Sequence, residues 1–244
     1  MENLKAVILA AGKGTRMESD LPKVIHTIDQ KPMVEYVIDA VKEAGIQQIC
    51  LIVGYKAEEV KNAVTSDVSY AYQEEQLGTG HAVKCAKDFI GEQGQVLVLC
   101  GDTPLITGKT LKSAMDYHTE SQNKMTVISA MVEDPTGYGR IIRDENGNFV
   151  KNVEHKDATE EERKSKEVNS GMYIFDAKDL QDALTKINNQ NAQGEYYLPD
   201  TLEIIKKEGG KVGAYILEDS DEMAGVNTKV QLEEAAKIMA KRKG

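Results

Sequence analysis

Short apolar runs alternate along the first half of the chain with longer segments in which apolar residues recur at helical spacing. The apolar runs predict buried strands at residues 6–11, 49–53, 68–72, 96–100 and 126–132. The longer segments predict helices at residues 32–44, 58–64, 81–89 and 111–118. Because the strands are apolar throughout, this rhythm predicts a Rossmann-like, three-layer α/β sandwich with a mostly parallel central sheet.

The pattern changes after residue 140. Residues 141–150 predict a hairpin, because Asn146-Gly147 supplies a tight turn between two strand-like runs. Further strands are predicted at residues 168–175 and 212–217, and helices at residues 178–187, 198–207 and 230–241. The charged run 157–167 predicts a solvated helix or loop. We expect this half to form a small β-containing lobe beside the main sheet. The lobe would close one side of a ligand-binding site.

Composition narrows the class of protein. The chain has 244 residues and is 41% hydrophobic, enough for one sizeable core with or without a small lobe. Its 40 acidic and 30 basic residues give a net charge of −10, which argues against nucleic-acid or anionic-membrane partners. No apolar run is long enough to span a bilayer or to serve as a secretory signal. We therefore expect a soluble, cytoplasmic protein.

The three cysteines carry no recognisable chemistry. Cys50, Cys85 and Cys100 are odd in number, lie in or beside apolar runs, and lack the spacing of a metal site. They are predicted to be buried, reduced packing residues, which favours a reducing compartment.

Three loops follow predicted strands at their carboxyl ends, where ligands of parallel sheets bind: residues 12–17, 73–80 and 101–104. In the first loop, Gly12 and Gly14 allow a tight turn that can present backbone N–H groups to an anion, and Lys13 and Arg16 add positive charge. Neither the Walker A motif nor the dinucleotide fingerprint is present, since Met17 stands where the third glycine of the fingerprint would be. A plain strand-to-helix turn is the alternative interpretation. Lys23 is either a solvated charge or a second cation aimed at the same phosphates.

Several sequence blocks carry a resemblance that covers essentially the whole chain. The first is L-A-A-G-K-G-T-R-M at residues 9–17. The others lie at residues 21–23, 73–81, 101–105, 134–141, 153–158, 167–169, 191–197 and 225–227. In these blocks the chain resembles the sugar-1-phosphate nucleotidylyltransferases. Within them it is most similar to the uridylyltransferase half of the bacterial bifunctional enzymes that also acetylate glucosamine 1-phosphate.

The resemblance implies a domain organisation. Residues 1–227 would form the nucleotidylyltransferase (pyrophosphorylase) domain, and residues 228–244 the linker helix that follows it. The acetyltransferase β-helix domain of the bifunctional enzymes is absent from this sequence. We therefore expect no acetyltransferase activity and, without the β-helix domain, a weakly associating or monomeric chain.

The resemblance also implies the nucleotide-binding residues. They lie at the end of the first predicted strand and in the first and second loops: Leu9, Ala10, Ala11, Gly12, Lys13, Gly14, Gln73, Gln76, Gly78 and Thr79. The side-chain amides of the second loop suit the uracil edge, because each offers a donor and an acceptor together. An amide that flips would suit cytosine equally, so the residues alone leave the base open.

Asp102 and Asn227 are implied to bind Mg²⁺. A carboxylate directly after a buried strand suits this hard ion, which takes oxygen ligands and keeps several waters. On residue type alone, Asp102 could instead be a turn or helix-cap aspartate, and Asn227 the cap of the last helix.

The sugar-binding residues implied by the resemblance are Gly101, Gly139, Glu154, Asn169 and Asn227. Without it, Gly139, Glu154 and Asn169 would be interpreted as a turn, a surface and a strand-edge residue. Glu195, Tyr196 and Tyr197 are candidates for the same lobe. The chain departs from the family at Cys100, where many relatives carry Tyr, and at Pro199, which replaces a Thr of some relatives.

The function implied is Mg²⁺-dependent transfer of UMP from UTP to N-acetyl-α-D-glucosamine 1-phosphate, for cell-wall precursor (peptidoglycan) synthesis. The products are UDP-N-acetylglucosamine and pyrophosphate, and Arg16, Lys23 and Asp102 are the catalytic candidates. Two alternatives remain. The acceptor could be another sugar 1-phosphate, such as glucose 1-phosphate, or the chain could be a non-catalytic nucleotide-sugar-binding protein. The latter would be expected to lack Lys23, Asp102 or Asn227.

Overall fold

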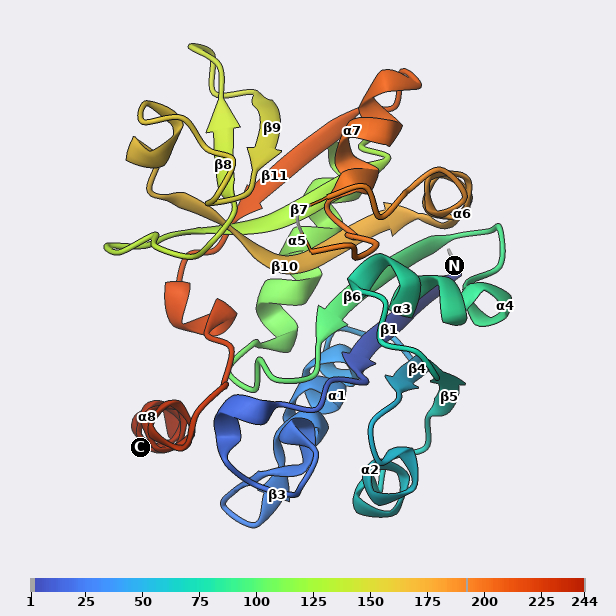
Figure 1. The fold of residues 1–244 in the computed structure, drawn as a ribbon, viewed down its shortest axis with the longest axis vertical. Helices are drawn as coiled ribbons and strands as arrows, with labels where there is room; N and C mark the ends of the chain where they lie inside the picture. The colour runs from blue at the N-terminus through green and yellow to red at the C-terminus, as the bar shows by residue number, and fades with distance from the viewer. Residues whose placement is uncertain (1–2, 192, 244) are drawn as a thin grey trace.

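A computed structural model describes residues 3–191 and 193–243 (Figure 1). Ala192 of the block 191–197 and Gly244 at the end of the predicted linker segment lie outside the described residues. The described residues form one large sheet with helices on both faces, joined at one side by a small β lobe.

The main sheet has the strand order β11-β7-β10-β6-β1-β4-β5. Its strands are β1 (Leu4–Ala10), β4 (Gln48–Val53), β5 (Ser69–Tyr72), β6 (Gln95–Cys100), β7 (Met125–Met131), β10 (Glu167–Asp176) and β11 (Val212–Ile216). β1 is parallel to β4 and β6, β4 to β5, and β7 to β11, whereas β10 is antiparallel to both its neighbours in this order. The predicted α/β class with a mostly parallel sheet is confirmed.

Successive side chains of a strand point to opposite faces of the sheet, so a hydrophobic core forms on each face. In β1, Ala6 and Ile8 face one core while Val7 between them faces the other, and all three are fully buried. The first core is covered by α1 (Met33–Glu43), α2 (Ala57–Ala63) and α5 (Gly108–Glu120). The second is covered by α3 (Thr79–Cys85), α4 (Lys87–Ile90), α6 (Ala177–Leu184) and α7 (Asp200–Lys207). Burial on both faces explains why the strands are apolar throughout.

The expected lobe is smaller than the sequence suggested. Among the described residues, the lobe beside the sheet consists of β8 (Arg140–Arg143), β9 (Phe149–Val153) and the 3₁₀ turn η3 (Glu162–Lys164), with Gly147 in the hairpin turn at φ 79° (Figure 1). β10 and β11, expected in the lobe, are strands of the main sheet. This expectation was wrong because strand pairing depends on distant partners, which local patterns do not reveal.

Three local details also differ from the predictions. The helix expected at residues 81–89 is broken at Ala86 into α3 and α4. Glu167, which ends the charged run, is buried at the start of β10, where its Oε2 lies 2.7 Å from Nε of Arg143. Among the cysteines, all free, only Cys50 is fully buried, whereas Cys85 and Cys100 are half-buried.

The last described helix packs against a segment near the start of the chain. A short hairpin, β2 (Thr27–Ile28) and β3 (Lys31–Pro32), packs with the start of α1 against the last helix, α8 (Lys229–Lys243). Arg242 of α8 donates to the carbonyl of Leu105 at 2.7 Å and to Oδ2 of Asp219 at 2.7 Å. None of the described helices is long and apolar enough to cross a membrane.

A buried carboxylate anchors the segment that leads into α8. Glu222 lies in the 3₁₀ turn η4 (Ser220–Met223) and is 6% exposed. It accepts hydrogen bonds from the backbone N–H of Thr107 at 3.1 Å and from the hydroxyl of Thr110 at 3.0 Å. Because these donors lie at the N-terminus of α5, the carboxylate also meets the positive end of that helix dipole.

We predict that Glu222→Ala lowers the free energy of unfolding by about 1–3 kcal/mol, because buried donors at the start of α5 lose their acceptor. Urea denaturation measures the change. Glu218→Ala, which removes an exposed carboxylate from the same segment, is the control and should stay within about 0.5 kcal/mol of the unmodified protein. Equal values for the two variants would contradict the anchoring role.

Candidate active site

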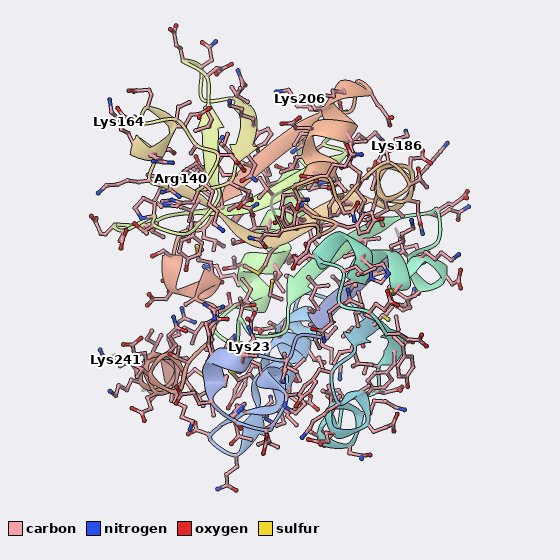
Figure 2. All side chains as sticks on the ribbon, in the orientation of Figure 1. Lys23, Arg140, Lys164, Lys186, Lys206 and Lys241 are labelled. Atoms are coloured by element: carbon pink, nitrogen blue, oxygen red, sulfur yellow. The ribbon has the colours of Figure 1, made fainter. Side chains whose placement is uncertain are left out.

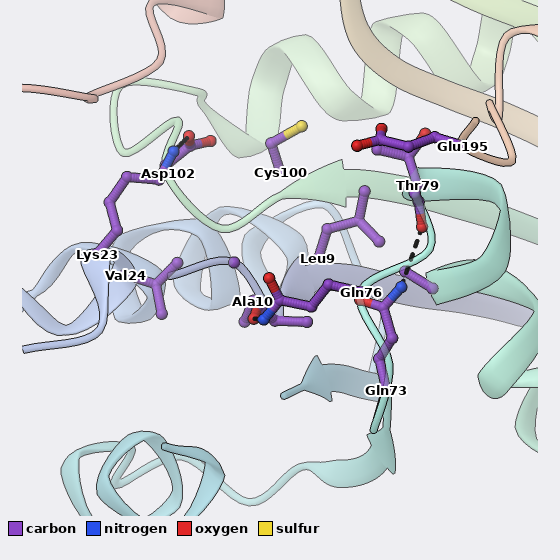
Figure 3. A pocket seen from close by; sticks show the side chains of 14 residues that line it. Leu9, Ala10, Lys23, Val24, Gln73, Gln76, Thr79, Cys100, Asp102 and Glu195 are labelled. Atoms are coloured by element: carbon purple, nitrogen blue, oxygen red, sulfur yellow. Dashed lines mark hydrogen bonds and ion pairs between the residues drawn. The ribbon is translucent and has the colours of Figure 1, made fainter. Parts of the chain in front are cut away.

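A cavity of about 340 Å³ opens at the carboxyl ends of the central strands (Figure 3). It is lined by Leu9, Ala10, Ala11, Gly12, Lys23, Val24, Gln73, Gln76, Gly78, Thr79, Ala82, Cys100, Asp102 and Glu195. All three loops chosen from the sequence contribute to it. We call this space the nucleotide cavity.

Gly14 makes room for Lys23. Its φ of 68° lies in the left-handed region, where it begins the 3₁₀ turn η1 (Thr15–Met17). A Cβ at this position would lie 2.4 Å from the Cβ of Lys23. At Gly12, by contrast, a Cβ would meet nothing within 4 Å. The first loop therefore needs glycine at position 14 for both its backbone conformation and its contact with Lys23.

Polar side chains lie around Lys23 at one end of this cavity. Its ammonium forms an ion pair with Oδ2 of Asp102 and donates to Oδ1 of Asn227 at 2.8 Å. Nη2 of Arg16 donates to the same amide oxygen at 2.9 Å. Lys23 and Asp102 have side chains that are 16% exposed, and the backbone N–H of Val226 donates to the carbonyl of Asp102 at 2.8 Å. We refer to Arg16, Lys23, Asp102 and Asn227 as the phosphate-end cluster.

Figure 2 shows how Lys23 differs from other labelled cations. Lys164, Lys186, Lys206 and Lys241 lie at the periphery of the molecule, whereas Lys23 lies among the elements at its centre. A lysine so placed is a fixed charge rather than a solvated one, because its two oxygen partners hold it.

The phosphate-end cluster fits a divalent cation. A carboxylate oxygen and an amide oxygen converge here on one positive charge, the Lys23 ammonium, and such oxygens are the ligands that Mg²⁺ prefers. Among the described residues there is no group of three or more His, Cys, Asp or Glu side chains that could hold a metal. An ion here would therefore take few protein ligands and complete its shell with water and phosphate oxygens.

The second loop forms the opposite end of the nucleotide cavity. The amide nitrogen of Gln73 donates to the carbonyl of Gly78 at 3.0 Å and lies 3.2 Å from Nδ1 of His81. The amide nitrogen of Gln76 donates to the carbonyl of Ala11 at 2.8 Å, tying this loop to the first one. Gly78 has a φ of 108°, and a Cβ there would lie 2.6 Å from the carbonyl oxygen of Tyr196. Close packing therefore fixes the backbone of this loop.

A second cavity, of about 250 Å³, adjoins the first and shares Leu9, Thr79 and Cys100 with it. We call it the sugar cavity. The predicted residues Gly139, Glu154 and Asn169 all line it: Gly139 directly precedes β8, Glu154 directly follows β9, and Asn169 lies in β10. A Cβ on Gly139 would lie 3.0 Å from Oε1 of Glu154, so a side chain at position 139 would crowd this carboxylate.

Asn169 has partners within the protein. Its amide nitrogen donates to the hydroxyl of Tyr173 at 2.9 Å, and its Oδ1 accepts from the backbone N–H of Gly171 at 2.9 Å. Behind the cavity, Asp200 has a raised pKa, first because of burial and then because of the negative charges of Glu203 and Glu154. This end of the site is therefore rich in carboxylates, in contrast to the phosphate end.

Some predicted residues lie apart from the places expected for them. Lys13 is exposed, and its ammonium lies 5.5 Å from the ring centroid of Tyr55 rather than in the phosphate-end cluster. Gly101 supports the cavity floor, since its N–H donates to the carbonyl of Leu9 at 2.9 Å. Asn227 belongs to the phosphate-end cluster, and the described lining of the sugar cavity includes neither it nor Gly101.

Sequence reasoning missed several lining residues. Val24 and Ala82 are apolar and carry no chemical signal. Cys100 was interpreted as a packing residue, yet it lines both cavities, and burial raises the pKa of its thiol to about 12, with Asp102 contributing. Glu195, considered for the sugar lobe, lines the nucleotide cavity instead. The position of Cys100, directly before Gly101-Asp102, was the available signal.

Comparison with known proteins defines the class. A family model described as nucleotidyl transferase matches residues 5–222, and the chain belongs to this family. A crystal structure from Bacillus anthracis, described as a glucose-1-phosphate thymidylyltransferase in complex with sucrose, has the same fold. It matches with a TM-score of 0.77 and 22% identity, covering 96% of this chain and 94% of that one.

Curated relatives are much closer in sequence. The bifunctional protein GlmU of Thermoanaerobacter pseudethanolicus is 55% identical over 242 residues, covering 99% of this chain and 53% of that protein. GlmU of Clostridioides difficile is 50% identical over 240 residues, covering 98% of this chain and 52% of the relative. The chain thus spans about half the length of these relatives.

We predict that Gly14→Ala lowers the free energy of unfolding by about 1–3 kcal/mol, because the new Cβ meets Lys23 and the left-handed backbone is strained. Gly12→Ala adds the same methyl group two residues away, into open space, and should change the stability by less than about 0.5 kcal/mol. Thermal and urea unfolding of both variants check this. A Gly14 variant as stable as the Gly12 variant would contradict the close approach of Lys23.

Proposed function

We propose that this chain transfers UMP from UTP to N-acetylglucosamine 1-phosphate, releasing pyrophosphate and forming UDP-N-acetylglucosamine. One observation carries the proposal. Lys23 and Asp102 of the phosphate-end cluster line the nucleotide cavity, which runs on one side to the amides of the second loop and on another to the sugar cavity. A nucleotide and a sugar phosphate that occupy these spaces would bring their phosphates together at Lys23.

We assign each part of the substrates to the side chains of the two cavities that can bind it. We infer that the amides of Gln73 and Gln76 and the backbone of Gly78 and Thr79 bind uracil. Glu154, Asn169 and Gly139 would hold the sugar, since a carboxylate and an amide can satisfy hydroxyl and acetamido groups. The carboxylates at this end would repel a phosphate, which favours an orientation with the sugar ring inside and its phosphate toward Lys23.

The reaction needs no protein nucleophile or general base, because the attacking phosphate oxygen is already anionic. That oxygen forms a bond to the α-phosphorus of UTP, and the bond to the departing pyrophosphate breaks. Holding the two reactants in line can lower the free-energy barrier by about 7–11 kcal/mol. We propose that Lys23 binds the reacting phosphoryl group, and that Arg16, Lys13 and the amides of residues 12–15 hold the pyrophosphate.

We propose Mg²⁺ as the divalent ion of this site, bound by Asp102 and Asn227. When bound, it would neutralise phosphate charge in the transition state. Lys23 would add a second fixed charge that does not depend on the metal. A cytoplasmic location, a monomeric chain and a role in cell-wall precursor synthesis are part of the same proposal.

The experiment that tests the proposal compares pyrophosphate release across a panel of sugar phosphates and nucleotides with Mg²⁺. We expect UTP with N-acetylglucosamine 1-phosphate to give the highest kcat/KM, and glucose 1-phosphate to be a poorer acceptor. A chelator should abolish the reaction, and added Mg²⁺ should restore it. A preference for glucose 1-phosphate would reassign the acceptor, and binding of the product nucleotide sugar without turnover would identify a binding protein instead.

We predict that Lys23→Ala and Asp102→Ala each lower kcat by about two orders of magnitude or more, since Lys23 is the fixed cation for the phosphates and Asp102 would hold the metal ion. Lys186→Ala, which removes an exposed lysine at the periphery of the molecule, is the matched control and should retain full activity. Circular dichroism should show that all three variants fold. Near-normal turnover in either cluster variant would remove that residue from the mechanism.

A further inference from the structure

A glutamate without an assigned role projects into the nucleotide cavity. Glu195 belongs to the irregular segment between α6 and α7, is half-buried, and lines this cavity beside Thr79 and Cys100. In Figure 3 its carboxylate extends from above Thr79 toward Cys100, at the side where the nucleotide and sugar cavities meet.

Backbone bonds hold Glu195 in register with the base-binding loop. The N–H of Tyr196 donates to the carbonyl of Leu77 at 2.8 Å, and the N–H of Gly80 donates to the carbonyl of Tyr196 at 2.8 Å. The hydroxyl of Thr79 accepts from the N–H of Leu198 at 3.1 Å. A carboxylate on this segment therefore keeps a fixed place relative to the second loop.

The same segment is also braced from within. The amide nitrogen of Asn191 donates to the carbonyl of Glu195 at 2.6 Å, and the amide oxygen of Asn191 accepts from the N–H of Glu195 at 3.3 Å. These bonds use only the backbone of Glu195. Its side chain can consequently be replaced without removing the contacts that shape the segment.

The chemistry of a carboxylate restricts what it can contact here. An ionised carboxylate only accepts hydrogen bonds, so it needs a donor on the ligand and repels phosphate. The phosphates of a nucleotide belong at Lys23, and its base belongs at Gln73 and Gln76. What lies between base and phosphates is the ribose, whose two hydroxyl groups are uncharged donors.

We propose that the Glu195 carboxylate accepts a hydrogen bond from a ribose hydroxyl of UTP and thereby selects ribonucleotides over deoxyribonucleotides. This inference rests on the proposed function, since it concerns the nucleotide of that reaction. A site built to bond a hydroxyl discriminates strongly against the analogue that lacks it, because the charged acceptor is then left unpaired.

The test compares kcat/KM for UTP, 2′-deoxy-UTP and 3′-deoxy-UTP in the unmodified chain and in Glu195→Ala. The unmodified chain should prefer UTP to at least one deoxy analogue by about 10- to 100-fold, the range for a hydrogen bond to a charged group. In Glu195→Ala this preference should shrink to less than about threefold, mainly through slower use of UTP. Glu195→Gln retains an uncharged acceptor and should lie between the two.

Glu75→Gln is the matched control. Glu75 lies on the same loop as Gln73 and Gln76, and is exposed outside the cavity lining. The variant removes the same charge from the same neighbourhood and should keep the preference of the unmodified chain. A loss of preference in this control as large as in Glu195→Ala would overturn the inference in favour of a general charge effect.

Calorimetric binding of the three nucleotides separates this inference from the proposed function. Failure of the unmodified chain to release pyrophosphate from UTP with any sugar phosphate would refute the proposed reaction, while the binding preference would still test Glu195. If Glu195→Ala weakens UTP and both deoxy analogues equally, or leaves all three unchanged, the carboxylate does not contact a ribose hydroxyl and the inference is wrong.

Discussion

The contact of the Lys23 ammonium with Asp102 and Asn227 is the interaction on which the site depends. It joins the loop after β1, the end of β6 and the segment before α8, which lie far apart in the sequence. A largely buried carboxylate without a positive partner would cost free energy, so this oxygen pair favours a cation beside it in the folded protein. The same requirement makes it a natural place for a metal ion.

Several features outside the cluster serve this contact. Gly14 lets the first loop pass close to the Lys23 side chain. Glu222 fastens the segment before Asn227 to the start of α5, and Arg242 fastens α8 to the carbonyl of Leu105. The packing of α8 on the β2–β3 hairpin adds an apolar contribution. The last helix therefore acts as a brace for the amide of Asn227 as well as a part of the core.

The strand β10 positions residues that line the sugar cavity. Its pairing with β7 shifts register between Asn169 and Met172, where Gly171 adopts a φ of 79°. The Asn169 side chain accepts a hydrogen bond from the N–H of Gly171 and so stabilises this irregularity. Because β10 lies antiparallel between β6 and β7, it brings the irregular stretch beside Cys100, which follows from topology rather than from local sequence.

Local patterns were sufficient where burial alone determines them. β1, β4 and β6 are buried on both faces, so their sequences are apolar apart from Lys5, Gln48 and Gln95 at their starts, and Asn146-Gly147 favours a tight turn by itself. Local patterns predicted β10 and β11 as strands but not their place in the main sheet, because the partners of a strand are set by tertiary packing. In the site, the resemblance indicated Lys23, Asp102 and Asn227, but only the fold shows that they meet. Glu195 was a candidate for the sugar lobe, and its place in the nucleotide cavity could not be foreseen because it lies on an irregular segment.

The distribution of charge along the site explains how an acidic chain can bind highly charged anions. Its net charge of −10 would repel phosphates at long range, yet screening at physiological salt confines that repulsion to about 8 Å. Within the site, Arg16 and Lys23 occupy one end, while Glu154, Asp200 and Glu203 surround the other. Phosphates are therefore attracted to a single end of the site and excluded from the rest. In the proposed reaction, two anionic reactants with uncharged rings would consequently approach with their phosphates toward the same point.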